Sequence, residues 1–322
     1  MQETLDTVLL LALPASGKSE VRRYLEFQTP ETCRTQFHMG PTVQLDDFPY
    51  VHMMRRIDDE LAKVGKARLF FSSSDKPFIN PIDWGTLIEL INEDYVDLIN
   101  KTQYSTDNSA DALYKRMDKA ALKVGGPARY ATVDAETRKK ILPALEPEAK
   151  KLMEDKLANY TDLKGKTLVI EAARGGKQGS SMPLPKPFGY EYSLAQLHPE
   201  ILKKAVILYI WVTPEESRRK NSARTNPNDP GSILHHGVPM DVMLNDYGCD
   251  DMDHLEKISS KPGTITVKAG GQTYNLPIGR FDNRVDATSF LRAEPKQWDP
   301  AAVNKVQTAI KQAMDKVFDM KK

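Results

Sequence analysis

Gly17, Lys18 and Ser19 are residue types that could bind phosphate, and they lie between an apolar run and a helical pattern. They fill three of the four fixed positions of the phosphate-binding pattern G-x-x-x-x-G-K-S/T, with Ala12 at the first glycine position. In that pattern, backbone N–H groups and the positive end of a helix hold the phosphates, the lysine reaches the terminal phosphates, and the hydroxyl ligates Mg²⁺. The spacing therefore predicts a site for ATP and Mg²⁺ made by Pro14, Ala15, Ser16, Gly17, Lys18 and Ser19.

The alternative for this stretch is a chance Gly-Lys-Ser at a helix start, where serine and glycine are ordinary residues. Alanine at position 12 would cost about 1 kcal/mol relative to glycine if the backbone there had positive φ, which is a tolerable cost. Strand, loop and helix follow one another in the required order, so the sequence favours the phosphate site.

Carboxylates follow two further apolar segments. Val43–Leu45 ends on Asp46 and Asp47, and Thr167–Ile170 ends on Glu171. Phosphoryl transfer needs a carboxylate for the metal and a group that orients or deprotonates the acceptor. We expect Asp47 to accept the proton of an acceptor hydroxyl, and Ser19, Asp46 and Glu171 to ligate Mg²⁺. A helix N-cap is the alternative for both aspartates, because an apolar helical pattern follows them.

A third candidate group is the run of basic residues on the helix predicted after Pro214: Arg218, Arg219, Lys220 and Arg224. Ion pairs at helical spacing explain two of them, Glu215 with Arg219 and Glu216 with Lys220. Arg218 and Arg224 remain as catalytic candidates, because arginines on a mobile helix can neutralise the charge of a transferred phosphoryl group.

These residues need a sheet that brings strand ends together. Val8–Leu13 is an unbroken apolar run, typical of a parallel strand covered on both faces, and Ser19–Glu26 reads as the helix after it. Ligands of open α/β sheets bind outside the carboxyl ends of the strands. The sequence therefore predicts an α/β fold with a doubly wound, mostly parallel sheet. Gly270 and Gly271 predict a hairpin near its end, and Pro277–Phe281 a final strand.

The segment between the second and third predicted strands reads as helical. We therefore predict a core formed by residues 1–50 and 165–322 and a helical insertion over residues 51–164, which would bind the acceptor or a protein partner. Within it, Ala135–Leu157 is predicted as a helical stretch interrupted by Pro143 and Pro147.

Composition limits the partners. The 322 residues include 45 basic and 44 acidic side chains, so no global field would recruit nucleic acid or an anionic membrane. This balance weighs against a kinase of nucleic-acid ends. Only two cysteines are present, Cys33 and Cys249, and Val8–Leu13 is too short to span a membrane. We expect a cytoplasmic protein.

The stretches "ALPASGKS", "LDDF" and "VIEA", together with the arginine-rich helix and the "PNDPG" and "GVPM" after it, resemble P-loop small-molecule kinases. The resemblance is to the nicotinamide riboside kinase and uridine kinase group. It implies that Lys18 and Ser19 serve ATP and Mg²⁺, Asp47 the acceptor hydroxyl, Glu171 the metal region, and Arg218 and Arg224 a lid. By resemblance, Asn283 would border the adenine, though an Asx turn explains it equally well.

This chain departs from the group at Ala12 and in the length of the helical segment, where the acceptor pocket of such kinases lies. The identity of the acceptor therefore does not transfer. The leading hypothesis is an ATP-dependent kinase of a small hydroxylated acceptor, such as a nucleoside or a sugar-like metabolite. The alternative is a P-loop ATPase or nucleotide-dependent switch whose helical insertion binds a protein partner.

Overall fold

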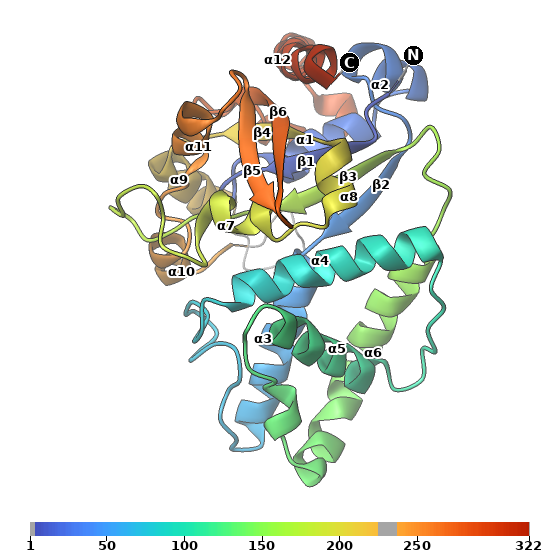
Figure 1. Cartoon of the computed structure of the whole chain (residues 1–322), viewed down its shortest axis with the longest axis vertical. Helices are drawn as coiled ribbons and strands as arrows, with labels where there is room; N and C mark the ends of the chain where they lie inside the picture. Colours follow the sequence, from blue (N-terminus) through green and yellow to red (C-terminus); the bar gives the residue numbers. More distant parts are fainter. Residues whose placement is uncertain (1–3, 225–236, 322) are drawn as a thin grey trace.

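The computed structural model describes residues 4–224 and 237–321, and Figure 1 shows their arrangement. A six-stranded sheet has the strand order β2-β3-β1-β4-β6-β5, and every neighbouring pair is parallel except β5 with β6. Its strands are β1 (Thr7–Leu11), β2 (Thr42–Asp46), β3 (Thr167–Ala172), β4 (Ala205–Trp211), β5 (Thr264–Ala269) and β6 (Gln272–Asp282). The predicted α/β class with a mostly parallel sheet is confirmed.

Helices cover both faces of this sheet. As a result, every residue of β1 and β3 is buried. One face packs against α1 (Lys18–Glu26), α2 (Pro30–Phe37) and α12 (Pro300–Lys321). The other packs against α4 (Asp83–Asn100), α7 (Gly189–Ala195), α8 (Pro199–Lys204) and α11 (Met252–Ile258). The strand register places Glu171 beside both Asp46 and Leu10, so β2, β3 and β1 end at one edge.

A second body of helices lies beside that edge, below the sheet in Figure 1. Between β2 and β3 the chain forms α3 (Phe48–Lys63), α4, α5 (Ser109–Lys123), the 3₁₀ helix η1 (Tyr130–Thr132) and α6 (Ala135–Ala158). These helices share a core with Leu13 and Val212, which follow β1 and β4, and with Tyr247, which follows α10 (Met240–Asn245). Helix α4 faces both ways, with Leu87 and Leu90 toward the helices and Ile88 and Ile91 toward the sheet.

The C-terminal half supplies strands β4, β6 and β5, which complete the sheet beyond β1. It also supplies segments that pack against the loop between β1 and α1. It contains α9 (Pro214–Arg224), α10 (Met240–Asn245) and the 3₁₀ helices η2 (Ser289–Arg292) and η3 (Pro295–Gln297). The hairpin predicted at Gly270 and Gly271 joins β5 to β6, and β6 includes the predicted strand Pro277–Phe281. No helix among the described residues is both long enough and apolar enough to cross a membrane.

One predicted interruption is wrong. Helix α6 continues without a break from Ala135 to Ala158, with Pro143 and Pro147 inside it. Both prolines lie on the exposed side of the helix, while Ile141, Leu145 and Ala149 bury the other side. Carbonyls that lose their N–H partner on that side can turn to water, so packing of the apolar side keeps the helix continuous.

Candidate functional site

The bend between β1 and α1 has the backbone conformation of a tight loop. Gly17 has φ 104° and precedes the first residue of α1, and Ala15 also has positive φ, at 55°. Ala12 is not among the described residues with positive φ, so an alanine at the first glycine position brings no left-handed strain. The cost expected at position 12 therefore does not arise, and the strained position is Ala15.

The carbonyl groups of this loop are held by the surrounding protein. Side-chain donors from outside the loop reach three of them: the Tyr190 hydroxyl donates to Ala12 O at 3.0 Å, Ser217 Oγ to Pro14 O at 2.7 Å and Asn283 Nδ2 to Ser16 O at 2.7 Å. In the described part of the chain, the backbone N–H groups of Gly17 and Ser19 find no acceptor. Amides without acceptors at the positive end of a helix fit an anionic ligand such as a phosphate.

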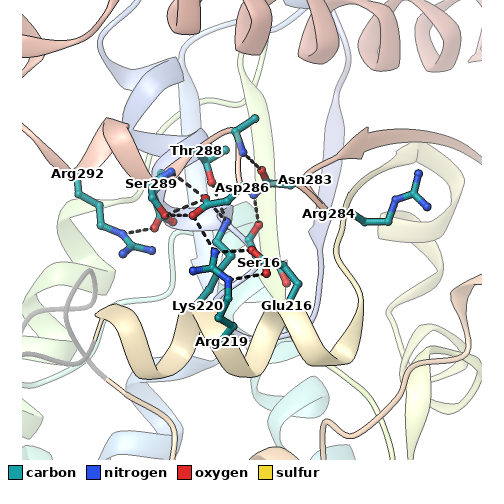
Figure 2. A network of polar contacts seen from close by, with 12 residues as sticks. Ser16, Glu216, Arg219, Lys220, Asn283, Arg284, Asp286, Thr288, Ser289 and Arg292 are labelled. Carbon is teal, nitrogen blue, oxygen red and sulfur yellow. Dashed lines mark hydrogen bonds and ion pairs between the residues drawn. The ribbon is translucent and has the colours of Figure 1, made fainter.

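Figure 2 shows a polar network that packs against this loop from α9 and from the segment after β6; Lys220, Asn283 and Thr288 are its buried part. Lys220 is 1% exposed, and its Nζ lies 2.8 Å from Asp286 Oδ1 and 3.2 Å from Thr288 Oγ1. Asn283 Nδ2 donates to Thr288 Oγ1 at 2.8 Å as well as to Ser16 O. A Cβ on Gly17 would lie 2.5 Å from Thr288 Oγ1 and 2.7 Å from Asn283 Nδ2. Glycine is therefore required at this contact.

The network corrects the predicted pairing on α9. Lys220 does not pair with Glu216, because it is buried against Asp286. Arg219 pairs with Glu216 at 2.6 Å, and Arg218 pairs with Glu215 at 3.0 Å. Burial raises the pKa of Asp286, but the charge and hydrogen bond of Lys220 outweigh it, and the pKa falls to about 2. Asp286 is thus ionised as the counterion of Lys220 at neutral pH.

The expected metal-binding carboxylates lie together at the ends of β2 and β3. Asp46 Oδ1 accepts the Phe48 N–H at 2.8 Å, and Glu171 Oε1 accepts from Arg22 Nη1 and from Gln44 Nε2, both at 2.9 Å. Burial, and then the charges of Glu171 and Asp47, raise the pKa of Asp46 to about 7. A cation bound among these oxygens would relieve that repulsion.

Asp47 is held by a buried arginine. Arg174 Nη1 lies 2.6 Å from Asp47 Oδ2, and the Arg174 side chain is 2% exposed and lies over the ring of Trp84 at 4.9 Å. Asp47 is the N-cap of α3 but makes no capping hydrogen bond with its side chain, whereas Asp46 bonds the Phe48 N–H in an Asx turn. The N-cap alternative therefore accounts for Asp46 in part and does not account for the side chain of Asp47.

One cavity joins the loop, the carboxylates and an aromatic region, with about 1070 Å³ of empty space including its open mouth. All six loop residues from Pro14 to Ser19 line it, together with Asp46, Asp47 and Glu171. Its other walls are formed by residues that the sequence reasoning missed, among them Arg55, Phe71, Phe78, Trp84, Asp246 and Tyr247. Of these, only Arg55 carries a signal in the sequence, since it follows Asp47 by about two helical turns on α3.

Of the two arginines expected in a lid, Arg218 is not brought to this cavity. Arg218 is not among its lining residues, and the side chain of Arg224 and the "TNPNDPG" stretch lie outside the described residues. A catalytic position for Arg218 would require it to leave Glu215. Exposed pairs of this kind contribute at most about 1 kcal/mol, so the pair is a small barrier to such a movement.

Metal binding by protein ligands alone has no support among the described residues, where no group of three or more His, Cys, Asp or Glu side chains could hold an ion. Ser19, Asp46 and Glu171 offer a hydroxyl and two carboxylates around the same cavity. Mg²⁺ typically takes one or two carboxylates, with waters and substrate phosphates as its remaining ligands. The oxygen donors present fit a magnesium ion that arrives with a nucleotide.

Comparisons of this chain with protein-family models, with curated proteins and with solved structures found no match. The geometry of the cavity is therefore the basis of the functional argument.

Proposed function

We propose that this protein is an ATP-dependent phosphotransferase of the P-loop type, which transfers the γ-phosphate of ATP to a hydroxyl group of a small molecule. One observation carries the proposal: a single cavity is lined by the amide-rich loop at the start of α1 and by Asp46, Asp47 and Glu171 at two neighbouring strand ends. Phosphoryl transfer needs both a phosphate site and carboxylates beside it. In this proposal the helices between β2 and β3 form an insertion that supplies the acceptor side of the cavity.

The loop residues would hold the nucleotide. The N–H groups of Gly17 and Ser19 would donate to phosphate oxygens, and Lys18 would place its ammonium group on the terminal phosphates. Ser19 Oγ with Asp46 and Glu171 would face Mg²⁺, directly or through water. When bound, the metal ion supplies positive charge that neutralises the phosphate oxygens during transfer.

Asp47 would act on the acceptor. Its carboxylate accepts a hydrogen bond from the acceptor hydroxyl and takes the proton as the new O–P bond forms and the bond between the γ-phosphorus and the bridging oxygen of ADP breaks. Arg174 fixes the orientation of this carboxylate through the contact at 2.6 Å. Lys18 and Arg55, which line the same cavity, add positive charge near the reacting groups.

The kinase hypothesis is tested by incubating the protein with Mg²⁺, ATP and fractions of small hydroxylated metabolites, and by searching for phosphorylated products by mass spectrometry. We expect one acceptor to be phosphorylated, with one ATP used for each molecule of product. Asp47→Asn should reduce the rate of transfer by about 10²–10⁴-fold while MgATP still binds. ATP hydrolysis that needs no acceptor and is unchanged in Asp47→Asn would overturn the proposal in favour of the ATPase or switch.

A further inference from the structure

The part of the cavity that lies beyond the carboxylates has an aromatic wall. The rings of Phe71 and Phe78 stack at 4.5 Å, Phe78 meets Trp84 edge-to-face at 5.0 Å, and Trp84 meets Tyr247 at 5.5 Å. All four side chains are buried and line the cavity. They come from the segment after α3, from α4 and from the segment after α10, so three separate parts of the fold build this wall.

Asp246 lies in the same wall of the cavity. It is 5% exposed, and within the described residues no hydrogen bond or ion pair reaches its carboxylate. Burial raises its pKa to about 7; the charge of Arg55 opposes this rise, and the charge of Asp241 adds to it. Arg55 itself lies over the Phe71 ring at 3.9 Å and donates to Ser74 O at 2.8 Å.

A buried carboxylate without a partner destabilises a fold, and an apolar residue of similar size would remove that cost. Its position in a cavity wall is explained if a ligand supplies the missing donor. Four further carboxylates line this cavity, those of Glu20, Asp46, Asp47 and Glu171, together with two cationic side chains, those of Lys18 and Arg55. Negative charge is therefore in excess, which disfavours an anionic acceptor. Aromatic faces, in contrast, attract both planar rings and cations.

We infer that this region is the acceptor subsite, and that the acceptor is a ring-bearing alcohol with a protonated amine, the ring against Trp84 and Tyr247 and the amine paired with Asp246. This inference rests on the proposed function, because the hydroxyl of the acceptor must reach Asp47. It excludes phosphorylated and carboxylated acceptors, and it predicts weaker binding of neutral nucleosides.

The test compares two probes that differ only in the amine: phenylethanolamine, and α-methylbenzyl alcohol, which lacks it. Each is titrated calorimetrically into the full-length protein with Mg²⁺ and a nonhydrolysable ATP analogue. The wild type should bind phenylethanolamine about tenfold or more tightly than the alcohol without the amine. In Asp246→Asn this ratio should fall to about one, while Asp241→Asn, in the helix that ends just before Asp246 but outside the cavity wall, should keep it.

A preference that persists in Asp246→Asn, or tighter binding of adenosine than of phenylethanolamine, would overturn the inference. Asp246→Asn removes an unpaired charge, so thermal unfolding should show a variant at least as stable as the wild type. Trp84→Leu gives a second check, since it should weaken both probes while leaving their ratio unchanged. Failure of the subsite is distinguishable from failure of the kinase proposal. Phosphoryl transfer by the wild type with no preference for the amine-bearing probe would refute only the subsite, and amine-dependent binding without transfer would refute only the kinase.

Discussion

Asp46→Asn should stabilise the protein in the absence of nucleotide while impairing catalysis. Asp46 lies beside Glu171 and Asp47, and its pKa is raised from 3.8 to about 7, first by burial and then by these two charges. Asparagine keeps the oxygen that accepts the Phe48 N–H at 2.8 Å and removes the charge. The substitution therefore separates the electrostatic cost of the site from its local hydrogen bonding.

The direction follows from the raised pKa. The carboxylate binds its proton more tightly in the folded state, so the penalty is absent below pH 3.8, grows as pH rises, and is complete above about pH 7. A rise from 3.8 to about 7 corresponds to an upper value of about 4 kcal/mol at about 1.4 kcal/mol per pKa unit. We expect Asp46→Asn to raise the free energy of unfolding by about 2–4 kcal/mol at pH 8 and by less than half as much at pH 5.

The assay is urea unfolding followed by circular dichroism at both pH values. Asp162→Asn is a matched control, because Asp162 Oδ1 accepts the Lys164 N–H at 3.0 Å in the same kind of turn, but on the exposed surface. It should change stability by no more than a few tenths of a kcal/mol. A saturating magnesium nucleotide should stabilise the wild type more than Asp46→Asn, because the bound cation offsets the charge that the variant lacks. An Asp46→Asn variant no more stable than the wild type at pH 8 would refute the reasoning.

Three further substitutions test the loop and its supports. Gly17→Ala places a Cβ 2.5 Å from Thr288 Oγ1 and should lower both stability and MgATP affinity. Gly65→Ala is the control, because Gly65 also has positive φ but nothing lies within 4 Å of the added Cβ. The control should lose only about 1–2 kcal/mol of stability, measured by thermal unfolding. Lys220→Met removes the buried cation of Asp286, while Arg219 stays 3.2 Å from Asp286 Oδ2, and it should cost about 1–3 kcal/mol, which the double variant with Asp286→Asn should partly restore; equal unfolding midpoints for the single and double variants would contradict the pairing. Arg174→Met releases the carboxylate it orients and should lower kcat with little change in KM for ATP, whereas a change in KM alone would point to a role in nucleotide binding.

The central strands of the sheet were predictable because they are short, mostly apolar runs. β1 and β3 are buried at every position, which is the pattern expected of parallel strands covered on both faces. The register of such strands brings their carboxyl ends to one edge, so Asp46, Asp47 and Glu171 could be placed near the loop from sequence alone. The short helix α2 gave no comparable signal, since Pro30–Phe37 buries only Phe37 fully.

Lys220 shows why the supports of the loop could not be predicted. Its spacing from Glu216 is that of a surface ion pair, so local pattern and real environment disagree. The partner, Asp286, lies in the segment between β6 and η2, far from Lys220 in the sequence. Only the packing of α9 against that segment reveals the pair. Contacts between distant segments leave no periodic trace in one sequence.

The aromatic part of the cavity was hidden for the same reason. Gly176 pairs with Cys249 through two backbone hydrogen bonds, of 2.9 and 3.2 Å, which tie the loop after β3 to the segment that carries Asp246 and Tyr247. In the sequence, the two glycines at 175 and 176 read only as a loop. The close approach of Gly175 to the backbone of residues 246–249 requires glycine, and it fixes the wall of the cavity.

The most direct test of the central claim is calorimetric titration of a nonhydrolysable ATP analogue, with and without Mg²⁺, into the wild type, Lys18→Ala and Lys164→Ala. Lys164 is an exposed lysine that precedes β3, at the edge of the sheet opposite to the loop, and so controls for loss of charge. The account predicts saturable, Mg²⁺-dependent binding to the wild type and to Lys164→Ala, and affinity at least about tenfold weaker in Lys18→Ala. No binding to the wild type, or equal affinity in all three proteins, would contradict it.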